Sequence, residues 1–526
     1  MEQLTPREWL REQLKRVPAF AASAGLMALI IIISMFIELS GARPTVQLAA
    51  TEAGLAEEER ATLSEIKPPE ITDLPPLPAD AQFVADAPED DNPGLTDAPF
   101  TGVENPIEFT EDPMSEALGP GSDPVPMEMT KKMAVIGTEA GTGGFRGLLG
   151  NRTAAGRRSA SRRYGKPPGT DEAVLAGLRW LKDHQVKTGP LTGSWAGGYS
   201  GQAPAAMTGL SLLAFLGYGC TDKQPAEFAE TVKLAVKYIL DQQAKSVKNE
   251  KLHGSFSEGA YSQAICTMAM AETYGMTGNM KAKESAQAAL DYILRVQADT
   301  GGFDYNDARA TGRLDMSISG FQLQAIKACM DIGIKLPEVS RIRTEAFLRS
   351  ATMTQEKGKP SPEYHTVYVV VPLWKEKDGK LVEIAGAVPG GSANGEPSPY
   401  NTALISNCRL TAASLTGRLF LGHGRTSTDC VGQARWLLSS PYLADPRAHN
   451  DLYYTYYMSL SMFQMGGEYW QKWNKYFNAP LRAIQVKEGP DKGCWNPPQY
   501  AGGGPVYTTA LACLSLEVYW RYAQKK

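Results

Sequence analysis

Histidine and clustered cysteine are scarce in this chain. Its 526 residues include 5 His and 7 Cys, and no two cysteines form a Cys-x-x-Cys pair. An odd number of scattered cysteines argues against a disulfide framework and against a cysteine-rich zinc module. Cys266, Cys329 and Cys513 lie in apolar helical stretches, which predicts small buried thiols. We therefore expect neither a metal site nor a cofactor.

An excess of positive charge is also missing. The chain has 53 Lys and Arg against 57 Asp and Glu, a formal net charge of −4. This balance excludes the basic composition of a general nucleic-acid binder. Hydrophobic residues make up 43% of the chain, which is enough for a sizeable core. The length exceeds that of one ordinary compact domain, so we expect repeats or linkers.

The N-terminal region contains one long apolar stretch, residues 17–39. No charge interrupts it between Val17 and Ile37, which is long enough for a helix that crosses a bilayer. Residues 1–16 carry several basic side chains, so the positive-inside rule places this head in the cytoplasm. We predict a single-pass anchor in the inner membrane, with the C-terminal part in the periplasm or outside. A cleaved signal peptide ending near residues 40–42 is the alternative.

Residues 40–135 are rich in Asp, Glu and Pro, which predicts a disordered linker. Residues 136–169 are rich in Gly and Arg and form a lead-in to the helical part of the chain. The basic residues of this lead-in suit either a solvated connection or a patch for an anionic partner. A phosphate-binding loop is less favoured, because no Gly-Lys-Ser/Thr occurs in it and no strand precedes it.

Helical periodicity begins at Thr170, which we expect to be an N-cap, and continues to the end of the chain. Outer helices with one apolar face alternate with more apolar inner helices. The expected pairs are 170–185 with 203–216, 226–243 with 260–274, 280–297 with 315–330, 338–353 with 402–420, 429–438 with 451–465, and 468–485 with 506–523. Six pairs at regular spacing predict a repeat architecture. The last inner helix is as apolar as the others, which favours a closed ring over an open solenoid.

Residues 357–398 interrupt the helical pattern. A β-branched and aromatic segment, an Asp-Gly turn and a second apolar segment predict an inserted β-hairpin with its strands near 364–375 and 380–388. The expected fold of residues 170–526 is therefore all-α, an (α/α)6 toroid with one β-hairpin at its rim.

One phrase recurs at the ends of outer helices: Gln, a short loop, and Gly-x-aromatic. A Gln side chain can donate to the unpaired carbonyls at a helix C-terminus, Gly permits a tight turn, and the aromatic ring covers the joint. We interpret the phrase as stitching between helices. Its four copies are Gln185 with Gly193 and Trp195, Gln243 with Gly254 and Phe256, Gln297 with Gly301 and Phe303, and Gln485 with Gly493 and Trp495.

This phrase resembles the repeat of squalene–hopene cyclases and of protein prenyltransferase β subunits. The resemblance covers residues 170–526 and implies an (α/α)6 toroid. The C-terminal segment is also similar to membrane-anchored bacterial envelope proteins that carry such a domain without an assigned activity. The resemblance implies isoprenoid chemistry only if the catalytic motifs of those enzymes are present.

Those motifs are missing. There is no Asp-x-Asp-Asp; Asp304 and Asp307 are the candidate acid pair, although a helix-initiation turn explains them as well. Zinc-binding prenyltransferases use Asp-x-Cys and a distant His, and the chain offers only Asp429-Cys430, or Asp491 with Cys494, beside His423 or His449. Because a zinc site needs three or four converging ligands, we predict no metal.

Aromatic residues gather on one inner helix and near the last joint. The candidate ligand pocket is formed by Tyr453, Tyr454, Tyr456, Tyr457 and Trp495, although large rings can also simply fill the axis. An apolar, glycan or peptide ligand is expected there.

Three functions are compatible with these observations. The first is a membrane-anchored binding or scaffold module rather than an enzyme. The second is a terpenoid cyclase or prenyltransferase-like enzyme. The third is a polysaccharide-active toroid, which needs Tyr, His and Arg beside a carboxylate; the candidates are Tyr453, His449 and Arg409.

Overall fold

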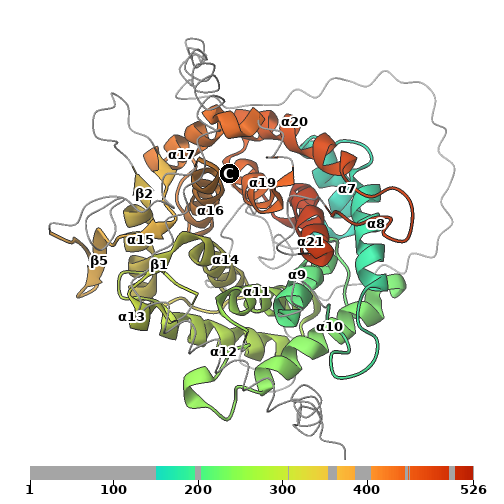
Figure 1. The fold of residues 1–526 in the computed structure, drawn as a ribbon, viewed down its shortest axis with the longest axis horizontal. Coiled ribbons are helices and arrows are strands. Elements are labelled where there is room, and N and C mark those ends of the chain that lie inside the picture. Colours follow the sequence, from blue (N-terminus) through green and yellow to red (C-terminus); the bar gives the residue numbers. More distant parts are fainter. Residues whose placement is uncertain are drawn as a thin grey trace, which may run out of the picture. The chain divides into compact units, whose positions relative to one another are not determined.

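A computed structural model describes residues 150–195, 203–256, 258–305, 307–353, 364–385, 404–444, 448, 450–496 and 504–524. All of them belong to one compact unit, Asn105–Lys526. Two concentric rings of helices form this unit (Figure 1). The predicted anchor and acidic linker lie outside the described residues. Among the residues that are described, no helix is both long and apolar enough to span a bilayer.

The two rings alternate along the chain. The outer helices are α8 (Thr170–Asp183), α10 (Ala226–Ala244), α12 (Met280–Val296), α15 (Glu338–Ala351), α17 (Thr428–Ser439) and α20 (Gly467–Ala483). The inner helices are α9 (Pro204–Gly217), α11 (Ala260–Thr277), α14 (Met316–Asp331), α16 (Leu404–Phe420), α19 (Leu452–Met465) and α21 (Gly504–Leu516).

Burial explains the division. The outer helix α8 buries one face that includes Val174, Leu178 and Leu181, whereas the inner helix α9 is buried all round from Ala205 to Gly217. Cys266, Cys329 and Cys513 are buried free thiols on inner helices, as predicted. Burial raises the pKa of each of them.

The ring is closed by contact between its last and first pairs. Helix α21 packs against both α8 and α9, and the Gln485 amide donates to the Ala173 carbonyl over 2.8 Å. The predicted closure is thereby confirmed, and the helices begin and end close to the expected positions. The cap of α8 is an exception: Gly169 is its N-cap, and Thr170 is the first helical residue.

The four Gln…Gly-x-aromatic joints share one set of hydrogen bonds. Each Gln amide donates to the carbonyl of its own loop glycine and to a group on the following outer helix. The second acceptors are the Thr231 carbonyl for Gln185, the Ser285 carbonyl for Gln243, Thr344 Oγ1 for Gln297 and the Ala173 carbonyl for Gln485. These bonds confirm that the phrase stitches neighbouring helices.

Glycine is required in these joints for two reasons. Gly193 has φ +91°, and a Cβ there would lie 2.3 Å from the Leu234 carbonyl oxygen. The aromatic residue that comes two positions later is enclosed and anchored; the Trp195 indole donates to the Leu181 carbonyl over 2.7 Å, and the Trp195 amide donates to Thr208 on the inner helix. One joint thus connects two outer helices and an inner helix.

The insertion differs from the predicted hairpin. Only its tip is a hairpin, β5 (Trp374–Lys377) with β6 (Lys380–Glu383), around the predicted Asp378–Gly379 turn. The preceding segment pairs with the helical body instead: β3 (His365–Thr366) with β2 (Thr352–Met353), and β4 (Val369–Val370) with β1 (Leu314–Asp315). The long first strand expected at 364–375 is therefore wrong. Its backbone groups find partners at the end of α15 and before α14.

The end of the lead-in is packed onto the ring. A 3-10 turn, η1 (Gly150–Arg152), precedes α7 (Ala154–Arg163), which packs against the C-terminal α22 (Val518–Arg521). Arg152 is 1% exposed, and its Nη1 lies 2.7 Å from Glu272 Oε2 on α11. Arg157 donates to the carbonyls of Arg152 and Tyr218. These two arginines are structural, whereas Arg158, Arg162 and Arg163 reach toward solvent.

Candidate functional site

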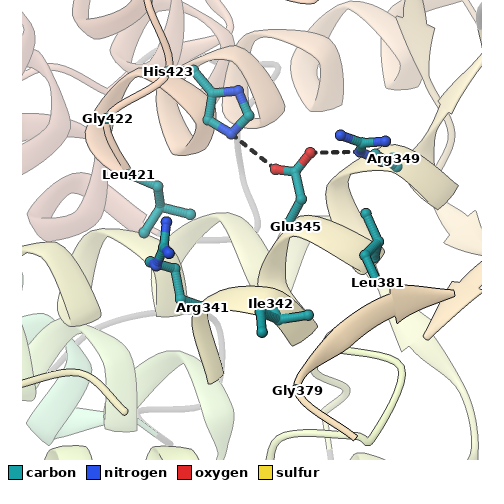
Figure 2. A pocket seen from close by; sticks show the side chains of 9 residues that line it. All are labelled: Arg341, Ile342, Glu345, Arg349, Gly379, Leu381, Leu421, Gly422 and His423. Carbon is teal, nitrogen blue, oxygen red and sulfur yellow. Dashed lines mark hydrogen bonds and ion pairs between the residues drawn. The ribbon is translucent and has the colours of Figure 1, made fainter. Parts of the chain in front are cut away.

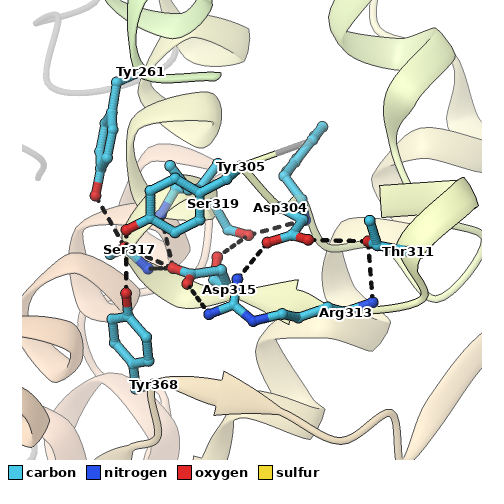
Figure 3. A network of polar contacts seen from close by, with 11 residues as sticks. Tyr261, Asp304, Tyr305, Thr311, Arg313, Asp315, Ser317, Ser319 and Tyr368 are labelled. Atoms are coloured by element: carbon cyan, nitrogen blue, oxygen red, sulfur yellow. Dashed lines mark hydrogen bonds and ion pairs between the residues drawn. The ribbon is translucent and has the colours of Figure 1, made fainter. Parts of the chain in front are cut away.

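Polar side chains converge where the inner helix α14 begins (Figure 3). We call this group the tyrosine–aspartate cluster; it consists of Tyr261, Asp304, Tyr305, Arg313, Asp315, Ser317 and Tyr368. It draws on the start of α11, the loop between α12 and α14, and the insertion. The cluster therefore lies at the end of the ring where inner helices have their N-termini.

Asp315 organises the cluster. It is 0% exposed and caps α14, because its Oδ1 accepts the Ser317 amide at 2.8 Å and the Ile318 amide at 3.2 Å. Its Oδ2 is 2.7 Å from Nη2 of Arg313. Burial alone would lower the pKa of Arg313, but Asp315 and Asp304 together raise it, so the guanidinium stays charged. The Arg313 guanidinium thus joins the two carboxylates of this cluster.

Three tyrosines cover these charges. The Tyr261 hydroxyl donates to Ser317 Oγ over 2.9 Å, and Ser317 donates to Asp315 over 2.6 Å. Tyr305 is 45% exposed, and its hydroxyl lies 3.1 Å from that of Tyr368. The ring of Tyr305 meets that of Tyr261 edge-on at 5.9 Å. Burial raises the pKa of Tyr261 and Tyr368, so both remain protonated donors at neutral pH.

Asp304 and Asp307, the predicted acid pair, have separate partners. Asp304 is buried, accepts Thr311 Oγ1 at 3.0 Å and forms an ion pair with Arg313. Asp307 is exposed and caps the short α13 (Ala308–Thr311) by accepting the Arg309 amide at 2.9 Å. The helix-initiation role suits Asp307, while Asp304 joins the tyrosine–aspartate cluster.

A second carboxylate with Arg and Tyr partners lies at the start of α19. Asp451 caps this helix, forms an ion pair with Arg409 of α16, and accepts the Tyr442 hydroxyl at 2.9 Å. Tyr453, also at the start of α19, donates to the Ser317 carbonyl over 3.3 Å and so connects this group to the cluster. His449 lies outside the described residues. Two of the three residues considered for a polysaccharide site are thus placed at this end of the ring.

Glu258 adds a carboxylate of a different kind. It precedes α11 by two residues and accepts the Ala205 amide at 2.8 Å, at the start of α9. Its side chain is partly buried, and this burial raises its pKa despite the hydrogen bonds that favour the anion. No arginine or lysine forms an ion pair with it among the described residues. Glu258 therefore differs from Asp304 and Asp315, which both pair with Arg313.

The predicted aromatic pocket is largely enclosed. Tyr454, Tyr456 and Tyr457 are at most 1% exposed, and Tyr453 is 8% exposed. Trp495 is fully buried, with its indole donating to the Leu481 carbonyl over 2.7 Å. Among the described residues of the tyrosine–aspartate cluster, Tyr305 provides the exposed aromatic surface instead.

The residues considered for zinc have separate partners. Asp429 forms an ion pair with Arg418, and Asp491 accepts the Trp180 indole. Cys430 and Cys494 are buried, and His423 contacts Glu345. In the described part of the chain, no group of three His, Cys, Asp or Glu residues could hold a metal ion.

Comparisons with known proteins find no matching family model and no matching curated protein. Solved structures with similar topology include the GH76A α-1,6-mannanase of Salegentibacter sp. HEL1_6, as an inactive variant in complex with α-1,6-mannotriose. It is 10% identical with a TM-score of 0.45, over 66% of this chain and 98% of that one.

Two further structures have the same kind of similarity. The GH76 α-mannanase BT2949 of Bacteroides thetaiotaomicron is 12% identical with a TM-score of 0.43, over 68% of this chain and 98% of that one. The cellobiose 2-epimerase of Spirochaeta thermophila DSM 6192 is 11% identical with a TM-score of 0.43, over 70% and 98%. At these values the likeness carries no argument about the activity of this chain.

These findings correct the family and function expected from the sequence. The similar structures are carbohydrate-active enzymes, so the predicted squalene–hopene cyclase or prenyltransferase family is wrong. The binding or scaffold module and the terpenoid enzyme are withdrawn with it. The physical reason is that the Gln…Gly-x-aromatic phrase satisfies helix ends and joins neighbours, so it reports ring closure and not chemistry.

Proposed function

We propose that the ring is a carbohydrate-active enzyme that binds a glycan chain at the N-terminal ends of its inner helices. The observation that carries the proposal is the tyrosine–aspartate cluster, in which an exposed tyrosine ring adjoins carboxylates held by an arginine. Sugar rings offer apolar faces and hydroxyl edges, which suit tyrosine rings and fixed carboxylates. The carbohydrate activities of the similar structures agree with this choice but do not carry it.

Within this site the residues have distinct roles. Tyr305 is the stacking platform, and the buried Asp304 and Asp315 keep Arg313 in place. Glu258 is the general acid, because burial raises its pKa toward the value that proton transfer to a glycosidic oxygen requires. Tyr261 lies three residues after Glu258 and donates into the cluster, which connects the acid with the binding surface.

The test separates binding from chemistry. The full-length protein is incubated with mannan, glucan and uronate oligosaccharides, and binding is followed by calorimetry and products by chromatography. Tyr305→Ala is expected to weaken binding about fivefold or more, whereas Tyr476→Ala, an exposed tyrosine on α20, is neutral. Glu258→Gln is expected to keep binding and to lower turnover by about a hundredfold or more. Absence of binding to every glycan would refute the proposal.

The location of the protein is a separate proposal. We infer from residues 17–39 that it is held at the inner membrane with its C-terminal part outside the cytoplasm. A reporter enzyme fused after Lys526 that is active only in the cytoplasm would contradict this orientation.

A further inference from the structure

A pocket outside the tyrosine–aspartate cluster lies between an outer helix and the insertion (Figure 2). It has a volume of about 420 Å³ and is bounded by α15, the β5–β6 hairpin and the loop between α16 and α17. We call it the α15 pocket. Its residues differ from those of the proposed glycan site.

The single carboxylate in the pocket wall is already neutralised. Glu345 Oε2 lies 2.9 Å from His423 Nε2, and Oε1 lies 2.6 Å from Arg349 Nε. Burial by itself would raise the pKa of Glu345, but His423 and Arg349 lower it to about 2. Glu345 is therefore an anion, with one oxygen on the Arg349 guanidinium and the other on the His423 imidazole.

Positive hydrogen-bond donors remain after this pairing. Arg349 uses only Nε for Glu345, and its two terminal nitrogens make no hydrogen bond to the described part of the chain. Arg341, two turns earlier on α15, pairs with the exposed Glu338 through Nε and Nη2. The charge of the buried Arg418 also lowers the pKa of Glu345. The terminal nitrogens of Arg349 are therefore the donors that this wall offers to a ligand.

The remaining walls are apolar. Ile342 of α15, Leu381 of β6 and Leu421 after α16 line the space (Figure 2). The Arg349 guanidinium is also supported by the Trp374 ring, 5.5 Å from its centroid. A cationic head group beside an apolar wall suits a ligand that has both an anionic group and an apolar body.

We propose that the α15 pocket binds a small amphipathic anion, a carboxylate or phosphate monoester with an aromatic or short aliphatic body. The anionic group contacts the terminal nitrogens of Arg349, whose planar guanidinium matches two oxygens at once. The body packs on Leu381 and Leu421. Such a ligand connects α15 with the hairpin and the α16–α17 loop.

Calorimetry on the full-length protein tests this directly with four probes: phenyl phosphate, phenylacetate, inorganic phosphate and the neutral phenylacetamide. The two aromatic anions are expected to bind more tightly than inorganic phosphate, and phenylacetamide is expected to bind at least about tenfold more weakly than phenylacetate. Equal binding of phenylacetate and phenylacetamide would overturn the proposal, as would no binding of any anion at millimolar concentration. A preference between the two anions identifies the head group.

Two variants assign the contacts. Arg349→Gln is expected to weaken both aromatic anions about tenfold, while Arg179→Gln leaves them unchanged. Arg179 is the control because it is also an exposed arginine of an outer helix that is paired with a glutamate, and it lies outside the pocket. Leu381→Asn is expected to weaken phenyl phosphate but not inorganic phosphate. Unchanged binding in Arg349→Gln would refute the site, and this result is independent of Tyr305 and Glu258.

Discussion

Two kinds of joint in the described part of the ring solve one problem differently. At the four stitched joints, the amide of one Gln supplies the carbonyls of the loop and of the following outer helix. At the insertion, α15 ends without such a Gln. Arg418, from the inner helix α16, donates to the Leu348 carbonyl and to Thr352, and Gln433 of α17 donates to Thr366 and Ser414.

This difference suggests how a repeat gains room for an insertion and for a pocket beside it. A neutral amide closes a short loop tightly and leaves no room between neighbours. At the end of α15, Arg418 of the inner helix α16 supplies the donor instead. The segment after α15 is therefore not needed to close a short loop, and it forms the strands β2 to β6. Both the α15 pocket and Tyr368 of the tyrosine–aspartate cluster belong to this looser joint.

The largest expected loss of stability comes from substituting the glycine of a Gln…Gly-x-aromatic joint. Gly193→Ala should destabilise the protein by about 3 to 5 kcal/mol, because the methyl group meets the Leu234 carbonyl oxygen at 2.3 Å at a positive φ. Gly189→Ala is the matched control in the same loop; it has φ +83° and nothing within 4 Å, so about 1 kcal/mol is expected. Urea unfolding measures both, and equal losses would contradict the close-approach argument.

Removing Arg418, which caps the end of α15, should lower the free energy of unfolding by less than Gly193→Ala does. Arg418→Met is expected to cost about 2 to 3 kcal/mol, since the Leu348 carbonyl and Thr352 lose a buried donor. Arg435→Met, an exposed position on α17, should be nearly neutral. Hydrogen exchange should locate the loss in α15 and the insertion; exchange that rises evenly around the ring would show that the two kinds of joint are equivalent.

The hydrogen bonds of Gln485, which close the ring, should contribute about 2 kcal/mol to the free energy of unfolding. Gln485→Met leaves the Ala173 and Gly493 carbonyls without their donor. Gln287→Met removes only an exposed contact with Asp291 and is the control. Thermal unfolding compares the two variants, and a Gln485→Met protein as stable as the wild type would argue against stitching as the source of closure.

Lowering the pH should destabilise α15 relative to the stitched helices, with a smaller effect than the substitutions above. The folded pKa of Glu345 is lowered to about 2, so its stabilisation is present above its unfolded pKa of about 4.5 and is lost as pH falls through the folded value. The amides of the stitched joints do not titrate. Between pH 6 and pH 3, exchange in α15 should accelerate by about tenfold relative to α12, and Glu345→Gln should abolish this difference. Equal acceleration in α12 would contradict it.

Much of the fold was predictable because its determinants are local and repeated. Outer helices such as α8 show a 3.6-residue apolar face, inner helices such as α9 are apolar throughout, and four Gln…Gly-x-aromatic copies indicate the joints. The insertion was only half predictable. Its Asp378–Gly379 turn is a local signal, but the pairing of Val369 with Asp315 depends on the ring bringing them together.

The site was harder to predict than the fold. Asp315 lies two residues before Ser-x-Ser at a helix start and so resembles an ordinary N-cap, and the cluster residues Tyr261 and Tyr368 are remote from it in sequence. Glu258 has no motif around it; only its burial between two helix starts distinguishes it. Tyr453 and Asp304 were named as candidates because aromatic and acidic residues cluster around them, although their contacts could not be inferred.

The buried pair of Arg152 and Glu272 determines at which end of the ring the described chain begins. Arg152 contacts Leu216, Glu272 and Arg521, which lie toward the C-terminal ends of α9, α11 and α22. The tyrosine–aspartate cluster lies at the opposite ends of the inner helices. Arg152 therefore fixes the first described residues at the end of the ring opposite the proposed glycan-binding mouth.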